Sequence, residues 1–575
     1  MVNDIYDPLD EYINVFKDKF IEVSKTTFAE LAAEANVDIE QNRRTCAELY
    51  GAENSLDDTR RLISRLIVWR AVLWLAAASS LVGISLTYNN EWWQPMTFAI
   101  GAVIVIFVLF NQILPQLKEM KNQRDNLEAR INQLHNETWL QMEPLNRLYD
   151  WDVLTRMMTQ TVPRLEFDPY FTTQRLADLK AVYDWDDSFN DDRSVIFSHS
   201  GLINGNPFII CRTRRMQWGE KTYHGSLTIY WTETKRDSNG NTKTVSCSQT
   251  LHASISKPFP VYDEKTQVFY GNTAAPNLIF NRHKSGFAGK ESSLSHKWQK
   301  YKLRRKARNL KNADYAMLTN EDFEVAFNTS DRNNNQEFAM LFSPLAQQSM
   351  MALMVDNDFA FGDDFDFLKN RMINTIESDH LQQLNLDLNP SVYHNFDYDK
   401  AEHDFYKINA MYFRAIYFSM APLLCVPMYQ QIRPLHDIYG RDMKAESSFW
   451  EHESLANFWG HDRFKHPDCV TDCILKTGRR QLSDGESIID VKAYGYRTEP
   501  RVTYVRKFGG DGRYHNVPVQ WDEYLPVVGE GSFHIREDSQ SEDASITCGQ
   551  RFRRIQSVLR ESDCELYRRH IASKA

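Results

Sequence analysis

The sequence predicts a mixed α+β membrane protein. N-terminal helices with a two-helix transmembrane hairpin and a short helical stalk precede cytoplasmic mixed domains that contain antiparallel sheet. Two uncharged apolar runs lie close together at 71–87 and 96–114, a heptad-like helical pattern follows them, and from about residue 194 the chain alternates as β-strands do. With 42% apolar and 25% charged residues, as in ordinary globular chains, most of the mass should be folded.

The two apolar runs are long enough to be membrane spans. Neither contains Asp, Glu, Lys or Arg, and each approaches the roughly 20 residues that cross a hydrocarbon layer about 30 Å thick. We therefore assign the transmembrane hairpin to 66–114, with spans at about 66–87 and 96–114. The alternative is a buried helical hairpin in a soluble core.

Charges around the two spans predict their orientation. Basic residues precede the first span and follow the second, whereas the connecting turn has none; they are Arg60, Arg61, Arg65, Arg70, Lys118, Lys121, Arg124 and Arg130. Because Lys and Arg stay on the cytoplasmic side, both termini should be cytoplasmic. Trp92 and Trp93 in the turn, and Arg70 at the edge of the first run, are expected at the membrane interface, where indole rings settle and long basic side chains can reach the headgroups.

The overall charge does not indicate a nucleic-acid-binding protein, and the cysteines do not indicate a disulfide-rich one. The net charge is −10, so any nucleic-acid partner would need a local basic patch. The eight cysteines are scattered, which does not indicate a disulfide framework and agrees with a cytosolic bulk.

Changes of composition along the chain predict seven segments. These are N-terminal cytoplasmic helices at 1–65, the hairpin at 66–114, a helical stalk or coiled coil at 115–145, an α+β domain at 146–376, a helical connector at 377–446, a β-rich C-terminal domain at 447–535, and an acidic linker with a terminal helix at 536–575. The stalk either pairs with the N-terminal helix of its own chain or supports an oligomer. A third uncharged run at 415–429 is interrupted by Pro422 and Pro427, which favours a buried helix or a membrane-surface segment over a third span.

Local patterns predict the elements of the two β-containing domains. An antiparallel sheet with short strands is expected at 193–280, with a hairpin tip at 237–241. The pattern at 323–327 predicts a strand, and the methionines after Ser343 indicate a helix whose Met-rich face is core. Strands resume from 487 to 528.

The order of these features is similar to the order found in a known protein family. Two adjacent spans and a β-rich region are followed by Phe323-x-Val325, by Glu337-Phe338, and by Leu341-Phe342-Ser343-Pro344 before a helix. This arrangement resembles an uncharacterised bacterial family of two-span membrane proteins of unknown function, often encoded near LemA-type membrane proteins. The likeness covers roughly 60–376, and the chain after 377 goes beyond it. The resemblance implies a multi-pass protein of the bacterial inner membrane and a LemA-type protein as partner, and it implies no catalytic residues.

No complete catalytic motif occurs in the sequence. A phosphate loop, a nucleophile elbow and a His-Glu-x-x-His zinc motif are all missing, and His452-Glu453 lacks its second histidine. Two acidic groups, at 363–366 and at 397–404, could form a carboxylate site, but their spacing is typical of a solvated acidic face.

Four residues could hold a structural zinc ion. Zinc takes imidazole and thiolate ligands, and the candidates are His461, His466, Cys469 and Cys473. A helix carrying Cys469 and Cys473 would bring both side chains to one face, because they are four residues apart. The alternative is two core cysteines with surface histidines.

The segment 297–311 is strongly basic and has no acid. Its cations are Lys297, Lys300, Lys302, Arg304, Arg305, Lys306, Arg308 and Lys311, and Trp298 and Tyr301 lie between them. Cations with aromatic residues suit anionic lipid headgroups or nucleic acid, and a solvated helix face is the alternative.

Together these patterns predict a membrane-anchored interaction or scaffold protein that faces the cytoplasm and contacts the lipid bilayer. The alternative is a membrane-tethered enzyme with a metal or carboxylate site in the C-terminal region. The lack of a complete catalytic motif favours the first.

Overall fold

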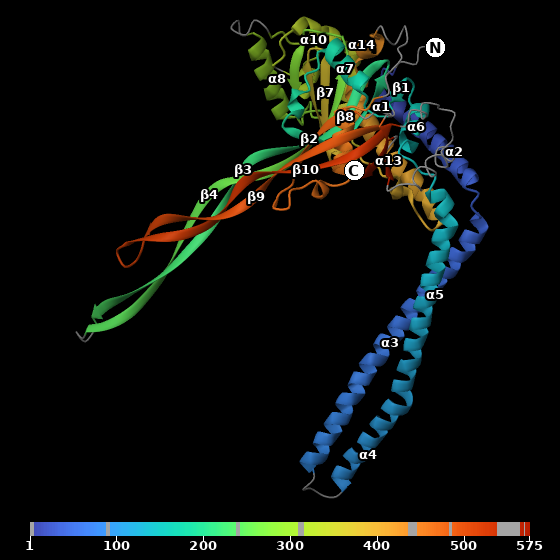
Figure 1. The fold of residues 1–575 in the computed structure, drawn as a ribbon, viewed down its shortest axis with the longest axis vertical. Helices are drawn as coiled ribbons and strands as arrows, with labels where there is room; N and C mark the ends of the chain where they lie inside the picture. The colour runs from blue at the N-terminus through green and yellow to red at the C-terminus, as the bar shows by residue number, and fades with distance from the viewer. Residues whose placement is uncertain are drawn as a thin grey trace. The chain divides into compact units, whose positions relative to one another are not determined.

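The computed structural model has the mixed α+β architecture that the sequence predicts (Figure 1). It describes residues 5–87, 93–168, 170–236, 242–308, 315–329, 331–434, 446–481, 486–537, 564–567 and 570–574. The chain divides into two compact units, which we call the globular unit (Met1–Ser24, Asp150–Asn389 and Asn409–Ala575) and the helical unit (Lys25–Tyr149 and Pro390–Ile408). Each is described by itself.

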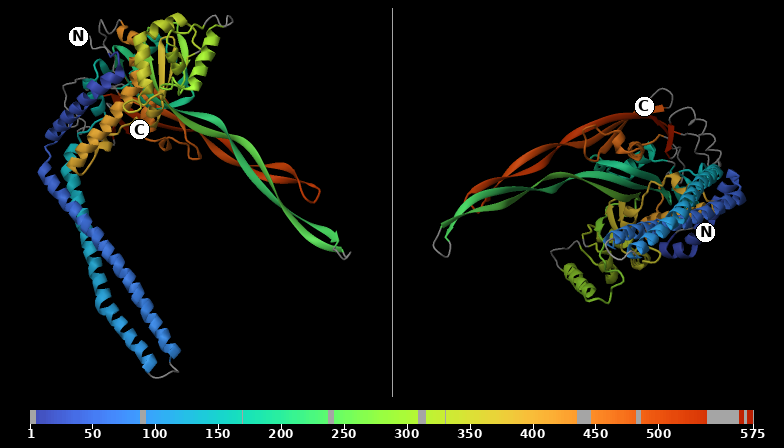
Figure 2. Two further views of the ribbon diagram at one scale, coloured as in Figure 1. Left: turned by 180° about the vertical axis from the view of Figure 1, so that it is seen from behind. Right: turned by 90° about the horizontal axis from the view of Figure 1, so that it is seen from below.

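The helical unit contains the predicted transmembrane hairpin. Its long helices are α3 (Ile39–Thr87), α4 (Trp93–Val108) and α5 (Leu114–Asn146), and a π-helical turn joins the last two. Figure 1 and Figure 2 show α3 running beside α4 and α5. Small residues allow this approach, because a Cβ at Gly83 would lie 2.7 Å from Cδ1 of Phe98.

Two helical stretches are long and apolar enough to cross a membrane. Among the described residues, these stretches are Ile39–Leu86 and Met96–Asn146. Inside the folded chain, only 6% of the most apolar part of the first and 11% of that of the second is buried. Large aliphatic side chains therefore point outward; Leu75 is 71% exposed and Leu86 is 77% exposed. This finding fits a membrane protein. Trp92 and the turn at 88–92 lie outside the described residues, and Trp93 begins α4.

The predicted stalk forms a pair with the N-terminal helix of its own chain. Across the two helices, Arg60 pairs with Glu128 at 3.0 Å and Arg130 pairs with Glu48 at 3.1 Å. Leu134 of the heptad-like pattern is buried. The coiled coil and the oligomer stay predictions.

The globular unit is built around two antiparallel sheets. The first has the order β1-β2-β3-β4-β7-β6-β5, and the second has the order β11-β12-β10-β9-β8. The strands of the first are β1 (Leu165–Phe167), β2 (Arg193–Ile203), β3 (Asn206–Arg236), β4 (Thr242–Gly271), β5 (Ile279–Arg282), β6 (Phe365–Asn370) and β7 (Ile373–Ser378). Those of the second are β8 (Ile474–Gln481), β9 (Glu486–Phe508), β10 (Tyr514–Glu537), β11 (Cys564–Tyr567) and β12 (His570–Lys574). The antiparallel sheet predicted at 193–280 is confirmed, but β3 and β4 are far longer than predicted.

Helices surround these sheets. They are α1 (Pro8–Glu11), the start of α2 (Lys17–Ala35), α6 (Val153–Thr161), α7 (Thr173–Tyr183), α8 (Leu294–Ala307), α9 (Glu321–Phe327), α10 (Asn335–Leu341), α11 (Pro344–Val355), α12 (Asp379–Gln383), the end of α13 (Tyr398–Leu424), α14 (Pro427–Gln431) and α16 (Phe449–Phe458). Met350 and Met354 on α11 are buried, which confirms the predicted core face.

The predicted strand at 323–327 is wrong, because these residues form α9. Asn320 caps this helix by accepting a hydrogen bond from the Phe323 N–H at 3.2 Å. Glu324 is buried, and its carboxylate accepts from Arg332 at 2.7 Å. The alternation of Phe, Glu and Val therefore does not mark a half-exposed strand, since the polar residue is as deeply buried as its neighbours.

The uncharged run at 415–429 is a buried helix, as one of the two interpretations predicted. It covers the end of α13 and the start of α14, and Tyr417, Ala421 and Cys425 are completely buried. It is not among the candidate spans found in the described part of the chain. The consecutive helices α10 and α11 are also apolar enough together, but they meet at 73° and bury Phe338 and Met350 in the globular unit.

Two long β-ribbons extend from the sheets of the globular unit. The β3–β4 ribbon and the β9–β10 ribbon lie alongside each other in Figure 1 and Figure 2, and we call them together the double ribbon. A cluster of buried side chains joins them: Ile229, Leu251, Ala253, Val517 and Val519. The backbones approach closely at Gly225, where a Cβ would collide with the carbonyl oxygen of Pro518. The ribbons therefore support each other.

Candidate functional sites

The β9–β10 ribbon has an apolar face that no described residue of the globular unit covers. Val505, Val517 and Val519 point toward the other ribbon. The alternate side chains point outward, because strand residues alternate between the two faces. They include Val502, Tyr504, Phe508 and Tyr514, which we call the outer stripe. Tyr504 is 66% exposed, and Phe508 and Tyr514 are each 60% exposed.

The outer stripe is organised by its own contacts. The rings of Phe508 and Tyr514 meet edge to face at 5.2 Å, directly opposite each other across the two strands. The guanidinium of Arg506 lies 4.2 Å from the Tyr514 ring centre. Adjacent exposed aromatic side chains with one cation form a surface that is suited to contact with another protein.

The outward face of the β3–β4 ribbon is different. Hydroxyl pairs span its strands, with Thr228 and Thr250 at 3.0 Å and Thr222 and Ser256 at 3.2 Å. Tyr230 is its one large exposed aromatic residue among the described pairs from 222 to 236 on this face. The predicted hairpin tip at 237–241 lies outside the described residues.

The predicted basic segment forms α8, and two of its cations are paired with carboxylates. Lys300 pairs with Asp322 at 2.5 Å and Arg304 pairs with Glu321 at 2.6 Å. Lys311 lies outside the described residues. Acids from α9 therefore reduce the charge of a segment that contains no acid itself.

The other face of α8 combines cations with exposed apolar residues. Leu294, Trp298 and Tyr301 are 85%, 58% and 61% exposed. Helical spacing places Lys297 and Arg305 on this same side. No ion pair joins either of these two cations to a carboxylate in the described part of the chain. This arrangement is typical of a helix that lies on an anionic lipid surface.

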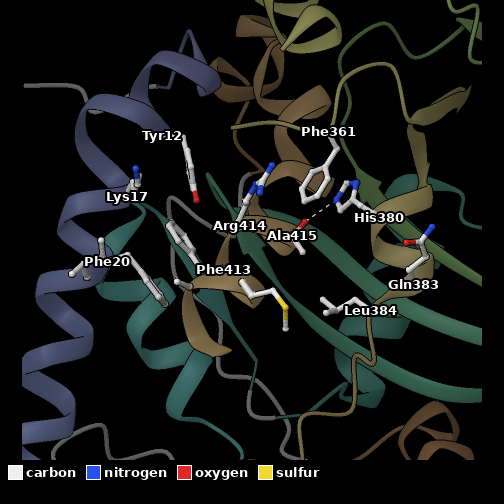
Figure 3. Close-up of a pocket in the computed structure, with 13 residues that line it drawn as sticks. Tyr12, Lys17, Phe20, Phe361, His380, Gln383, Leu384, Phe413, Arg414 and Ala415 are labelled. Atoms are coloured by element: carbon white, nitrogen blue, oxygen red, sulfur yellow. Dashed lines mark hydrogen bonds between the residues drawn. The ribbon is translucent and has the colours of Figure 1, made fainter. Parts of the chain in front are cut away.

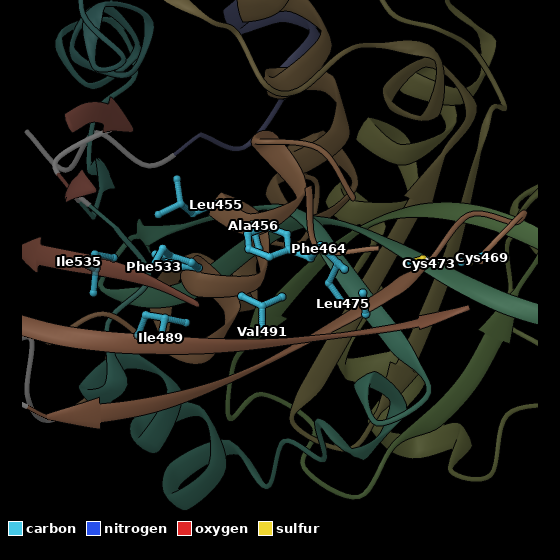
Figure 4. Packing of buried hydrophobic residues seen from close by; sticks show 11 residues of the cluster. Leu455, Ala456, Phe464, Cys469, Cys473, Leu475, Ile489, Val491, Phe533 and Ile535 are labelled. Carbon is cyan, nitrogen blue, oxygen red and sulfur yellow. Dashed lines mark hydrogen bonds between the residues drawn. The ribbon is translucent and has the colours of Figure 1, made fainter. Parts of the chain in front are cut away.

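The four proposed metal ligands do not come together. Cys469 and Cys473 have their sulfur atoms 3.7 Å apart, but they lie in an irregular segment before β8 and not on a helix (Figure 4). Nε2 of His461 lies 3.4 Å from Asp472, and Nδ1 of His466 accepts from the Asp468 N–H at 3.2 Å. No group of three or more His, Cys, Asp or Glu side chains among the described residues is arranged to hold a metal ion.

The two cysteines instead belong to the hydrophobic core of the second sheet. Figure 4 shows them at one end of a cluster that includes Phe464, Leu475 and Val491. Burial, with a smaller contribution from Cys469, raises the pKa of the Cys473 thiol to about 12. The core alternative fits this geometry, and the two cysteines do not lie on one helix.

Three carboxylates of the acidic groups have specific side-chain partners. Asp363 pairs with the buried guanidinium of Arg282, and Asp364 contacts the ring of His380. In the helical unit, Asp399 accepts a two-pronged contact from Arg43. These three carboxylates therefore contact partners within the fold, whereas carboxylates on a solvated acidic face would contact mainly water.

Sequence reasoning missed one buried carboxylate in a pocket. Glu453 on α16 is fully buried and borders a polar cavity of about 380 Å³. Its carboxylate accepts from the Val195 N–H at 3.0 Å and from Lys476 at 3.2 Å. Burial raises the pKa of Glu453 to about 7, although Lys476 opposes this shift. The sequence signal was His452-Glu453, which the missing second histidine made uninformative.

Comparisons with protein families, with curated proteins and with solved structures returned no match to this chain.

Proposed function

We propose that the protein is a membrane-anchored interaction or scaffold protein of the bacterial inner membrane, with both termini and the globular unit in the cytoplasm. The outer stripe of the double ribbon is the observation that carries this proposal. Large aromatic side chains that remain exposed next to one another are unusual on a soluble surface unless they contact a partner. The partner that the resemblance implies is a LemA-type membrane protein.

The topology follows from the charges that flank the candidate spans. We expect a cysteine introduced at Asn90 to react with a membrane-impermeant maleimide in intact cells, because the turn lies outside. The parent protein is the matched control, since all eight of its cysteines lie outside the hairpin and would be on the cytoplasmic side. Labelling of the parent at Cys564 in intact cells would contradict this topology.

Site-specific cross-linking tests the interaction surface. A photoreactive phenylalanine at Tyr504 should give one discrete adduct with the same partner as one at Phe508. The matched control is the same group at Tyr230, which is exposed on the other ribbon. Adducts that are equal at all three positions would indicate collision only and would reject the stripe as a binding surface.

The α8 face supports an additional contact with anionic lipid. In nanodiscs that contain phosphatidylglycerol, amide exchange over 294–307 should be slower than in phosphatidylcholine discs, and salt should remove the difference. Replacing Lys297 and Arg305 by Gln should abolish the effect, because these cations carry no carboxylate partner in the described residues. Replacing Arg304 by Gln is the control, since Glu321 already pairs with it. Equal exchange in both lipids would reject the contact.

The second candidate function is a membrane-tethered enzyme, and Glu453 is the observation that favours it. A carboxyl with a pKa of about 7 in a polar cavity is suited to general acid–base chemistry. However, Val195 and Lys476 already occupy both carboxylate oxygens. A structural role therefore explains the contacts equally well and requires no substrate.

The two roles of Glu453 predict different results for Glu453→Gln. The folded pKa lies above the ordinary value of 4.5, so the bound proton stabilises the fold fully below pH 4.5, and this contribution is lost as the pH rises through about 7. This rise in the pKa of Glu453 corresponds to about 3 kcal/mol of folding free energy. The amide should flatten the dependence of the unfolding midpoint between pH 5 and 8 in either role. A catalytic carboxyl also requires that the amide abolish function in the native host, so a functional Gln variant would reject the enzyme.

A further inference from the structure

A second cavity of the globular unit has a different chemistry. It has a volume of about 530 Å³ and lies between the N-terminal helical segment, α12 and α13 (Figure 3). This size is within the roughly 300–1,000 Å³ of small-molecule sites. Figure 3 shows Tyr12, Lys17 and Phe20 on one side, with Gln383 and Leu384 across from them.

The walls of this cavity are mainly apolar. Phe20 and Phe413 stack with ring centres 4.2 Å apart, and Tyr12 packs beside Phe413 at 5.7 Å. These two phenylalanines are almost completely buried, and the apolar surface that stays open to the cavity belongs to Ile21, Leu384 and Met411. A fully hydrophilic ligand would leave these surfaces in contact with water.

Two cations and a hydroxyl interrupt the apolar walls. Arg414 is fixed because Nε donates to the Phe359 carbonyl at 2.6 Å and Nη2 donates to the Ala360 carbonyl at 3.0 Å. Within the described residues, no protein acceptor binds its Nη1, the Tyr12 hydroxyl or the ammonium of Lys17. Burial raises the pKa of Tyr12 and the charge of Arg414 opposes the shift, which agrees with the closeness of these two groups.

His380, which lines the cavity, has hydrogen-bond partners at both of its ring nitrogens. Nδ1 of His380 contacts Asp364, Nε2 donates to the Ala415 carbonyl at 3.0 Å, and the ring stacks on Phe361 at 3.9 Å. No acid lines the cavity among the described residues. The charge of the site is therefore positive, and the protein supplies no anion to Arg414 or Lys17.

We propose that this cavity binds a small amphipathic monocarboxylate, such as a medium-chain fatty acid. The alkyl chain lies against Ile21, Leu384 and Met411, and the carboxylate accepts hydrogen bonds from Arg414 Nη1 and the Tyr12 hydroxyl, with Lys17 at the mouth. Charge complementarity and the apolar walls both favour this class, because a neutral ligand would supply no anion to the two cations. A π-helical turn at Tyr12–Phe16 carries one of the donors, and such turns occur frequently at functional sites.

Equilibrium dialysis of the full chain tests the site. The protein is held in phosphatidylcholine nanodiscs, the probe is radiolabelled dodecanoate, and empty discs correct for partition into lipid. We expect saturable binding of one dodecanoate per chain. Arg414→Gln should weaken it about tenfold or more, because it removes a charged hydrogen bond. Methyl dodecanoate, which has the same chain without the charge, should compete poorly. If dodecyl phosphate displaces dodecanoate more strongly than unlabelled dodecanoate does, the anion is a phosphate and the carboxylate assignment is wrong.

Further variants separate binding from folding, because Arg414 also holds the 358–360 carbonyls. Met411→Trp leaves every cation in place and fills the cavity from a half-exposed position, so it should reduce binding without lowering the unfolding midpoint. Lys17→Gln should weaken binding about threefold, since exposed charges contribute little. Lys25→Gln, on the same helix but outside the cavity, should bind as the parent does. The proposal would be overturned if discs with the protein took up no more dodecanoate than empty discs. It would also be overturned if Met411→Trp bound dodecanoate as tightly as the parent does.

Discussion

The hairpin of candidate membrane spans and the double ribbon both expose large apolar side chains, but in different patterns. In the hairpin, consecutive residues are exposed together: Leu81 and Val82 are 61% and 59% exposed, although neighbours on a helix point about 100° apart. In the β9–β10 ribbon, exposed Tyr504 is followed by Val505, which faces the other ribbon. An apolar surface on all sides suits a lipid environment, whereas an apolar surface on one side suits a single partner.

The largest expected effect distinguishes these two environments directly. Leu81→Arg places a charge within the first apolar run, which costs about 2.5–3.5 kcal/mol at the centre of a span. We expect a large fraction of this variant to become extractable from membranes at alkaline pH. Tyr504→Arg introduces the same residue on the outer stripe and should stay fully membrane-bound. Equal extraction of Leu81→Arg and the parent would contradict the assignment of the span.

The same difference explains which parts of the fold could be predicted from sequence. A span is a local property, because run length and absence of charge can be counted along the chain. The length of β3 cannot be counted in this way. Its middle section carries Arg214, Lys221 and Gly219, and the strand continues because β4 pairs with it along its whole length. That pairing is a non-local contact and leaves no clear alternation in the sequence.

The contacts of the candidate site residues could not be predicted from the sequence for a similar reason. The spacing of Cys469 and Cys473 is compatible with a helix, but the structure brings their sulfur atoms together beside Gly495 of β9, where a Cβ would collide with Cys469 Sγ. The basic segment was correctly identified as an element rich in cations, yet its neutralisation by Glu321 and Asp322 depends on how α9 packs on α8. Neither partner can be inferred from the segment itself.

The inner face of the double ribbon should respond more strongly to truncation than its outer face. Val519 is completely buried between the ribbons, so Val519→Ala should cost about 1–3 kcal/mol of local stability through lost burial and a cavity. We expect faster amide exchange in the distal parts of β9, β10 and β3, with no change in β6 and β7. Unchanged exchange in both ribbons would show that they do not support each other.

The smallest expected effect on stability is the most informative about function. Tyr504 is two-thirds exposed, and its replacement by Ser should change the free energy of unfolding by no more than about 0.5 kcal/mol, as is usual for surface sites. If the outer stripe binds a partner, the same substitution should remove an aromatic anchor and weaken that complex by about 2 kcal/mol, or roughly thirtyfold. The matched control is Tyr230→Ser, which removes the same side chain from the hydroxyl-rich face of the other ribbon. The measurements are the unfolding midpoint and the retention of the partner that was cross-linked at Tyr504. If both variants retain the partner equally, the outer stripe is only an exposed aromatic surface. If Tyr504→Ser alone loses the partner while its unfolding midpoint is unchanged, the side chain of Tyr504 contributes to binding and not to folding.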